Sequence, residues 1–98
     1  MSPIDNPQNS WTFLTNHTHV LLCLAENPKM RMKEIAARVL ITERAVQRII
    51  AELTDAGYIS HEKKGRCNNY QIDLNKKLRH PIEADKTIAE LINLLKKD

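Results

Sequence analysis

The spacing of apolar residues predicts helices in the first half of the chain. Apolar side chains recur three and four positions apart over about residues 15–26, where Asn27-Pro28 ends the pattern, and again over 33–39 and 42–56. This spacing places the apolar side chains of each segment along one side of a helix. We therefore expect three short amphipathic helices.

The third of these helices has the clearest boundary signals. Thr42 is a suitable N-cap, because its hydroxyl can accept a hydrogen bond from an orphan backbone N–H. Glu43 follows in the first turn, where the helix dipole favours a carboxylate, and Gly57 stands where a left-handed helix ending favours glycine. The apolar side of this helix is formed by Ala45, Val46, Ile49, Ile50 and Leu53.

Beyond this helix the hydrophobic period changes from helical spacing to alternation. Residues 58–62 and 69–74 alternate as strands do, and residues 63–68 between them contain glycine, asparagine and three cations. The pattern predicts a β-hairpin with a basic turn. Residues 30–32 also alternate, which permits a further brief strand.

A last helix is expected after Pro81, because apolar residues again follow helical spacing there. Residues 1–10 contain two prolines and several turn-formers, so we interpret them as an irregular arm. The predicted fold class is mainly α with a small antiparallel β-hairpin (α+β). We divide the chain into the arm, a domain over residues 11–80 and a C-terminal helix over residues 81–98.

Composition restricts the chain to one soluble globular domain. The chain has 98 residues, of which 42% are hydrophobic and 28% charged, which excludes a disordered polyelectrolyte and a fibrous repeat. The longest apolar run is far shorter than the roughly 20 residues of a membrane-spanning helix. No signal peptide opens the sequence, and two cysteines agree with a reducing compartment, so we expect a cytoplasmic protein.

The positive charge lies in the middle of the chain. Residues 29–66 carry nine basic side chains against five acidic ones, whereas the net charge of the whole chain is only +3. A basic centre favours a polyanionic partner, although a solvated surface explains charge almost as well.

Two helices, the second well capped and followed by a basic hairpin, form the layout of a winged helix-turn-helix. Residues 33–53, 56–59 and 65–70 together resemble the MarR-type winged helix-turn-helix regulators of bacteria and archaea. The resemblance implies a winged helix-turn-helix that binds double-stranded DNA as a transcriptional regulator, most simply a repressor that blocks access sterically. It also implies association with the nucleoid when DNA is bound.

The resemblance assigns base reading to the helix over residues 42–56, the recognition helix. Arginine can pair with guanine and glutamine with adenine through two hydrogen bonds, and the N-terminal half of such a helix reaches the base edges. The alternative is a solvated helix face, on which Arg48 pairs with Glu52 one turn later. The candidate DNA-binding residues of this helix are Thr42, Glu43, Arg44, Gln47 and Arg48.

A second group of candidates lies in the hairpin, which is the wing of the fold, and around the start of the second helix. The cations of these segments are suited to contacts with DNA phosphates, and Arg66 is also suited to insertion in a narrow minor groove. Asn68 and Asn69 either add hydrogen bonds to DNA or serve only as turn residues. The candidates of this group are Arg31, Lys33, Lys63, Lys64, Arg66, Asn68 and Asn69.

Two positions depart from the family pattern. Leu40 stands at the turn between the two helices, where a small residue is usual, and we expect the turn to be slightly opened because a branched residue is strained in a left-handed conformation. Arg31 stands where the family has a Ser or Thr cap. The loss of this cap removes about 1 kcal/mol of helix stabilisation.

Other chemistry is weakly signalled. His19 and Cys23 are four residues apart and could share a metal ion, but two ligands are too few, and a buried cysteine is the commoner arrangement. Cys67 next to Arg66 could be a redox-sensitive thiol. No set of residues at catalytic spacing is present, so we expect neither an enzyme nor a cofactor, and no metal site.

The apolar stripe of the last helix exceeds what docking to the chain's own core requires. We expect it to hold a homodimer, with help from the apolar patch at Trp11, Phe13 and Leu14; the alternative is that it only covers the core. The competing function is a winged helix that binds other proteins, and an unidentified small-molecule effector is a further candidate partner. The candidate dimerisation residues are Ile88, Leu91, Ile92 and Leu95.

Overall fold

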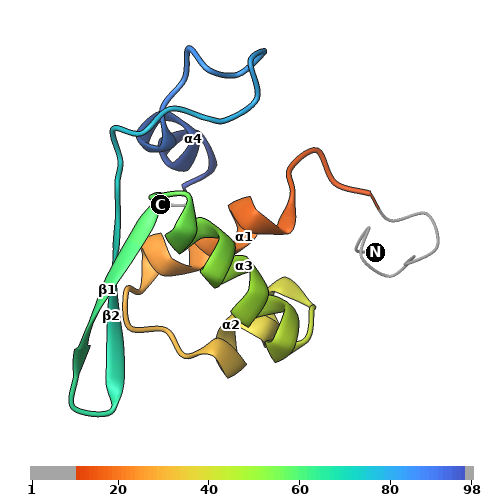
Figure 1. Cartoon of the computed structure of the whole chain (residues 1–98). Helices are drawn as coiled ribbons and strands as arrows, with labels where there is room; N and C mark the ends of the chain where they lie inside the picture. The colour runs from red at the N-terminus through yellow and green to blue at the C-terminus, as the bar shows by residue number, and fades with distance from the viewer. Residues whose placement is uncertain (1–10, 97–98) are drawn as a thin grey trace.

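The computed structural model describes residues 11–96, so the expected N-terminal arm lies outside the described residues. The described chain forms four helices and one antiparallel hairpin, which confirms the predicted fold class (Figure 1). The elements are α1 (Asn16–Glu26), α2 (Met32–Val39), α3 (Glu43–Asp55), β1 (Ile59–Lys64), β2 (Cys67–Ile72) and α4 (Ile88–Leu95). None of the described helices has the length and apolar character needed to cross a membrane.

The core lies where α1, α2 and α3 meet. The apolar side expected for the third helix is buried, with Val46 and Ile49 at 0% and 2% exposure. The hairpin adds Ile59 and Tyr70 to the core, and α4 adds Ile88. Because one face of α3 is buried in this core, its opposite face lies at the surface.

The turn between α2 and α3 is closed, which corrects the expectation that Leu40 would open it. Leu40 takes the left-handed conformation, with φ 68° and ψ 43°. This conformation lets the N–H groups of Leu40 and Ile41 both donate to the carbonyl of Ala36, at 2.8 and 3.1 Å. The Leu40 side chain is 58% exposed, so its branches meet water rather than the core.

Both ends of α3 follow the sequence signals. The hydroxyl of Thr42 accepts a hydrogen bond from the N–H of Ala45 at 3.0 Å. Gly57 takes φ 83°, and the N–H of Tyr58 then donates to the carbonyl of Leu53 at 2.9 Å. These bonds fix α3 between the turn and the wing.

The hairpin is longer and its turn shorter than expected. Lys64 pairs with Cys67, so only Gly65 and Arg66 lie between the strands. The prediction of a turn over 63–68 was wrong in extent, because ladder pairing continues through residues whose polarity suggested a loop. Asn68 and Asn69 are therefore strand residues, and their interpretation as turn formers was also wrong.

Two further predictions need correction. Residues 30–32 do not form a strand: α2 already begins at Met32, and it is the carbonyl of Pro28 that accepts a hydrogen bond from the N–H of Tyr70 at 2.9 Å. The last helix begins at Ile88 rather than after Pro81, because Thr87 and Glu90 form a capping box there.

Candidate nucleic-acid interface

The candidate residues of the recognition helix lie together on its exposed face. Thr42, Glu43, Arg44, Gln47 and Arg48 are all exposed, on the side of α3 opposite the buried Val46, Ile49 and Leu53. This grouping follows from the helical period, which separates positions 44, 47 and 48 from the core-facing positions. The face offers arginine and glutamine donors in the first two turns of the helix.

The two arginines of this face differ in their surroundings. Among the described residues, Arg44 and Gln47 have no side-chain partner. Arg48 lies one turn before Glu52, and its Nη1 is 3.8 Å from Oε2 of that carboxylate. The pairing considered as an alternative to base reading is thus present, with both side chains still about half exposed or more.

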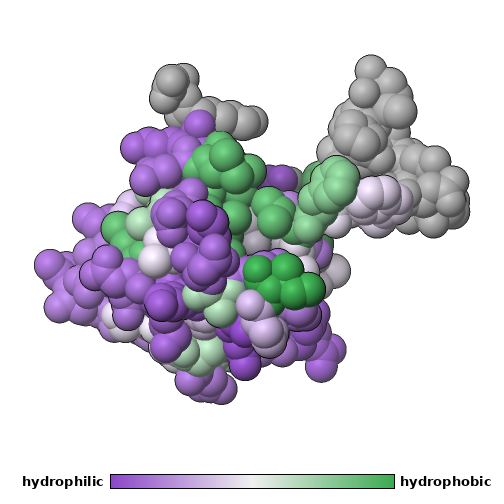
Figure 2. Space-filling view, turned by 90° about the horizontal axis from the view of Figure 1, so that it is seen from above, coloured by the Kyte–Doolittle hydropathy of each residue, from purple (hydrophilic) through white to green (hydrophobic). Residues whose placement is uncertain are grey.

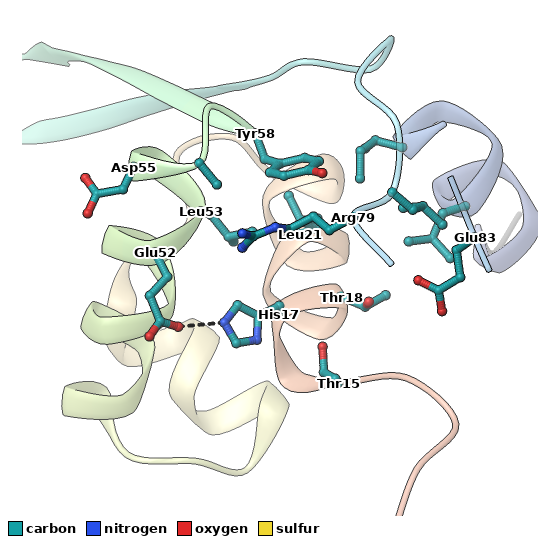
Figure 3. A pocket seen from close by; sticks show the side chains of 14 residues that line it. Thr15, His17, Thr18, Leu21, Glu52, Leu53, Asp55, Tyr58, Arg79 and Glu83 are labelled. Carbon is teal, nitrogen blue, oxygen red and sulfur yellow. Dashed lines mark hydrogen bonds and ion pairs between the residues drawn. The ribbon is translucent and has the colours of Figure 1, made fainter. Parts of the chain in front are cut away.

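A histidine of α1 holds the same carboxylate. Nε2 of His17 lies 2.7 Å from Oε1 of Glu52, as the dashed line in Figure 3 shows. This hydrogen bond, aided by the charge of Arg48, lowers the pKa of Glu52 below its ordinary value. Sequence reasoning missed this contact, because His17 and Glu52 are 35 residues apart and no spacing rule connects them.

The wing cations are distributed over both faces of the hairpin and its turn. Successive strand residues point to opposite faces, so Lys63 shares a face with Asn68 and Lys64 shares the other with Cys67. Nζ of Lys64 lies 4.0 Å from a carboxylate oxygen of Glu62, and Arg66 is exposed in the turn. Lys63 and Lys64 thus leave opposite faces of the hairpin, and Arg66 lies at its turn.

The asparagines of β2 are half-buried and less free than the cations. The amide of Asn68 donates to the hydroxyl of Tyr70 at 3.3 Å, and Asn69 stands opposite Glu62 in the ladder. Asn68 thus has a partner within the hairpin already.

The cations near the start of α2 are exposed. Arg31 occupies the N-cap position without making a side-chain cap, in agreement with the sequence analysis, and Lys33 follows in the first turn. Arg38, at the other end of the helix, forms a two-pronged pair with Glu26 of α1 at 3.0 and 2.9 Å. Arg38 therefore ties two helices together, whereas Arg31 and Lys33 face solvent.

The residues considered for metal binding are engaged otherwise. Nδ1 of His19 lies 2.9 Å from the amide oxygen of Asn16, and Cys23 is buried in the core, where burial raises the pKa of its thiol. Within residues 11–96, no three side chains of the His, Cys, Asp and Glu types are grouped so that they could hold a metal ion.

The candidate dimerisation residues divide into two sets. Ile88 is 2% exposed in the chain's own core, and Ile92 packs against that core. Leu91 and Leu95 are half-buried, with Leu94 beside them at 79% exposure. Figure 2 shows apolar surface gathered on the face of the molecule that carries α4.

An open pocket lies between α1, the end of α3 and the segment before α4 (Figure 3). Its walls are apolar at Leu21, Leu53 and Tyr58, and its rim carries Arg79 and His17 along with acidic side chains. Because both signs of charge meet at this rim, the lining does not select a ligand of one charge.

Comparison with known proteins agrees with this geometry. The family described as winged helix-turn-helix DNA-binding matches residues 14–60, which include α1, α2 and α3. No curated protein matches the chain significantly.

Two solved structures are similar to this chain in fold. The wild-type ZitR of Lactococcus lactis in complex with DNA is 22% identical, with a TM-score of 0.51 over 65% of this chain and 46% of that one. The MarR family transcription regulator SP03579 is 19% identical, with a TM-score of 0.53 over 84% of this chain and 51% of that one. The chain thus spans about half the length of these structures. Its fold is a winged helix-turn-helix, and the resemblance to MarR-type regulators is confirmed in the fold.

Proposed function

We propose that this winged helix-turn-helix protein binds double-stranded DNA in a sequence-specific manner and regulates transcription, as a repressor that blocks access to its site. The recognition helix α3 would lie in the major groove and the wing along the backbone or in the minor groove. The observation that carries the proposal is the exposed face of α3, where Arg44, Gln47 and Arg48 stand side by side. The DNA complex of ZitR, whose fold is similar, supports the same use of this fold.

The chemistry of this face suits base recognition. A guanidinium donates two hydrogen bonds to guanine and a glutamine amide pairs with adenine, each such pair discriminating by about 1–3 kcal/mol. Arg44 and Gln47 carry no competing partner among the described residues, so their donors are available. Arg31, Lys33, Lys63, Lys64 and Arg66 would supply the phosphate contacts that set register and orientation.

Salt dependence of binding tests the proposal. A protein that neutralises about six phosphates shows a log–log slope of about −5 against salt, because condensed counterions are released. We expect a steep slope on arbitrary duplex DNA, and enrichment of one motif when bound sites are selected from random DNA. Absence of binding at low salt would instead favour a winged helix that binds proteins.

The regulator would act as a homodimer. Since Ile88 and Ile92 serve the chain's own core, we place the contact on Leu91, Leu94 and Leu95, with Trp11 and Phe13 as a second apolar patch at 73% and 93% exposure. Two-fold symmetry would place the two recognition helices about one DNA turn apart, on a palindromic site. Light scattering at tens of micromolar protein should give the dimer mass, and a monomer mass there would contradict this arrangement.

A further inference from the structure

Glu52 lies on α3, beside the exposed face of this helix that carries Arg44, Gln47 and Arg48. One of its oxygens lies 2.7 Å from Nε2 of His17 on α1, and the other lies 3.8 Å from Nη1 of Arg48 on its own helix. The carboxylate therefore bridges a side chain of the scaffold and a side chain that is a candidate for base contact. It is also an acidic group placed beside a surface that would meet a polyanion.

We infer that Glu52 is a specificity-determining residue, which positions Arg48 and weakens its contact with phosphate relative to its contact with guanine. This inference rests on the proposed DNA-binding function. It assigns sequence discrimination to an acidic residue that touches no base.

The geometry of the pair leaves Arg48 able to read a base. Glu52 approaches the guanidinium at Nη1, whereas an arginine side chain has five N–H donors in a planar fork. The remaining donors can still form the bidentate pair with guanine O6 and N7. At 3.8 Å the carboxylate attracts the fork as an ion-pair partner, and it takes up none of the fork's hydrogen bonds.

The negative charge of Glu52 affects the contact of Arg48 with phosphate more than its contact with guanine. A phosphate is an anion and is repelled by the adjacent carboxylate, whereas guanine is neutral and offers fixed acceptor atoms. Pairing with Glu52 also cancels part of the attraction of Arg48 for any phosphate. Non-specific binding depends almost entirely on such attraction, so it should suffer more than binding to the preferred site.

His17 makes this arrangement persistent. A carboxylate on a flexible side chain would move away from Arg48 as easily as toward it, because exposed ion pairs are weak. The contact with Nε2 of His17, at 2.7 Å, gives one oxygen of Glu52 a second partner on another helix, which narrows the positions that the carboxylate takes beside the recognition helix. It also keeps the carboxylate ionised, in agreement with its lowered pKa.

The test compares Glu52→Gln with Asp55→Asn, a matched loss of one exposed carboxylate near the end of the same helix. Asp55 contacts neither Arg48 nor His17 in the described structure. Binding is measured over a range of salt on two duplexes, the best site selected with the wild-type protein and a scrambled version of it.

We expect E52Q to bind the scrambled duplex about two- to fivefold more tightly and the selected site with less than about twofold change, so that discrimination falls. The salt slope on the scrambled duplex should steepen by about 0.9 per protomer, because the freed Arg48 neutralises one more phosphate. Both effects should disappear in the Arg48→Ala background. D55N should leave discrimination unchanged.

Equal changes for E52Q and D55N, or equal tightening of E52Q on both duplexes, would overturn the inference while leaving DNA binding intact. If the wild-type protein bound no duplex at low salt, the proposed function itself would fail. Circular dichroism and urea denaturation of E52Q provide the check that the variant is folded.

Discussion

Lys63 and Lys64 are neighbours in the sequence, yet their side chains leave opposite faces of β1. Lys63 stands across from Asn68 on the face that also carries the buried Tyr70, and Lys64 stands across from Cys67 on the outer face, where Glu62 is 4.0 Å away. DNA that meets the hairpin from one side contacts one of these faces more closely than the other. On the proposed function, we therefore expect the two lysines to contribute unequally to phosphate binding.

We predict that Lys63→Ala and Lys64→Ala differ in their effect on binding. The variant that removes the DNA-facing cation should reduce the salt slope by about 0.9 per protomer and weaken binding to all sequences alike, whereas the other should change the slope by much less. Slopes measured on one scrambled duplex decide which face of the wing meets DNA. Identical slopes for the two variants would show that DNA contacts both faces of the wing alike and would contradict this prediction.

The left-handed Leu40 predicts a stabilising substitution. A non-glycine residue at φ 68° carries about 1–2 kcal/mol of strain, and the exposed side chain of Leu40 contributes little burial in return. Glycine removes the strain but adds freedom to the unfolded chain, so Leu40→Gly should raise the free energy of unfolding by about 0.5–1 kcal/mol.

Urea denaturation measures this change, and Ala37→Gly is its control. Ala37 is exposed within α2, where glycine should cost about 0.5–1 kcal/mol. The two glycine substitutions should thus act in opposite directions, three residues apart. A loss of stability in L40G would show that the Leu40 side chain stabilises the folded state although it is largely exposed.

The two cysteines should react with a thiol reagent at very different rates. Cys23 is 7% exposed and burial raises the pKa of its thiol, whereas Cys67 is only half-buried on β2. At neutral pH we expect one fast thiol and one slower by on the order of 100-fold, because Cys23 must wait for an opening of the core. Cys67→Ser should remove the fast phase, and urea should make both thiols fast. A fast phase that survives in C67S would place Cys23 at the surface.

The hydrogen bond between His17 and Glu52 predicts a pH dependence. It lowers the pKa of Glu52 below the ordinary 4.5, so the unfolded chain takes up this proton at a higher pH than the folded one. The stabilising contribution of the pair is therefore complete above about pH 4.5 and is lost as the pH falls through the lower, folded value. In an NMR titration of the Glu52 carboxyl carbon, His17→Ala should raise the midpoint toward 4.5, and Arg48→Ala should raise it less. An unchanged midpoint in H17A would show that the contact is not formed in solution.

Local signals predicted those parts of the fold that depend on neighbouring residues. The limits of α3 follow from Thr42 and Gly57, and its exposed face follows from the helical period alone. The alternating pattern predicts the hairpin but gives too long a turn. Strand pairing continues through polar residues such as Asn68 and Lys64 when they have partners in the ladder.

Contacts between distant segments could not be predicted. The start of α4 depends on a capping box at Thr87, but helical spacing after Pro81 suggested an earlier start. The partner of Glu52 is set by the packing of α1 against α3, which no local pattern encodes. The closed turn at Leu40 shows that hydrogen bonds to one carbonyl can outweigh a local conformational preference.

The hydrogen bond from the N–H of Tyr70 to the carbonyl of Pro28 has a consequence for the order in which the domain opens. This N–H is bonded to a segment 42 positions earlier, whereas the hairpin pairs only residues within 59–72. Amide hydrogen exchange at Tyr70 therefore reports the attachment of the wing to the helical part, and exchange at hairpin-bonded amides of β2 reports the hairpin itself. If the wing detaches as an intact ribbon, the Tyr70 amide exchanges faster than those amides, and the hairpin then moves as an arm connected to the helical part only at the ends of its strands, at Ile59 and Ile72.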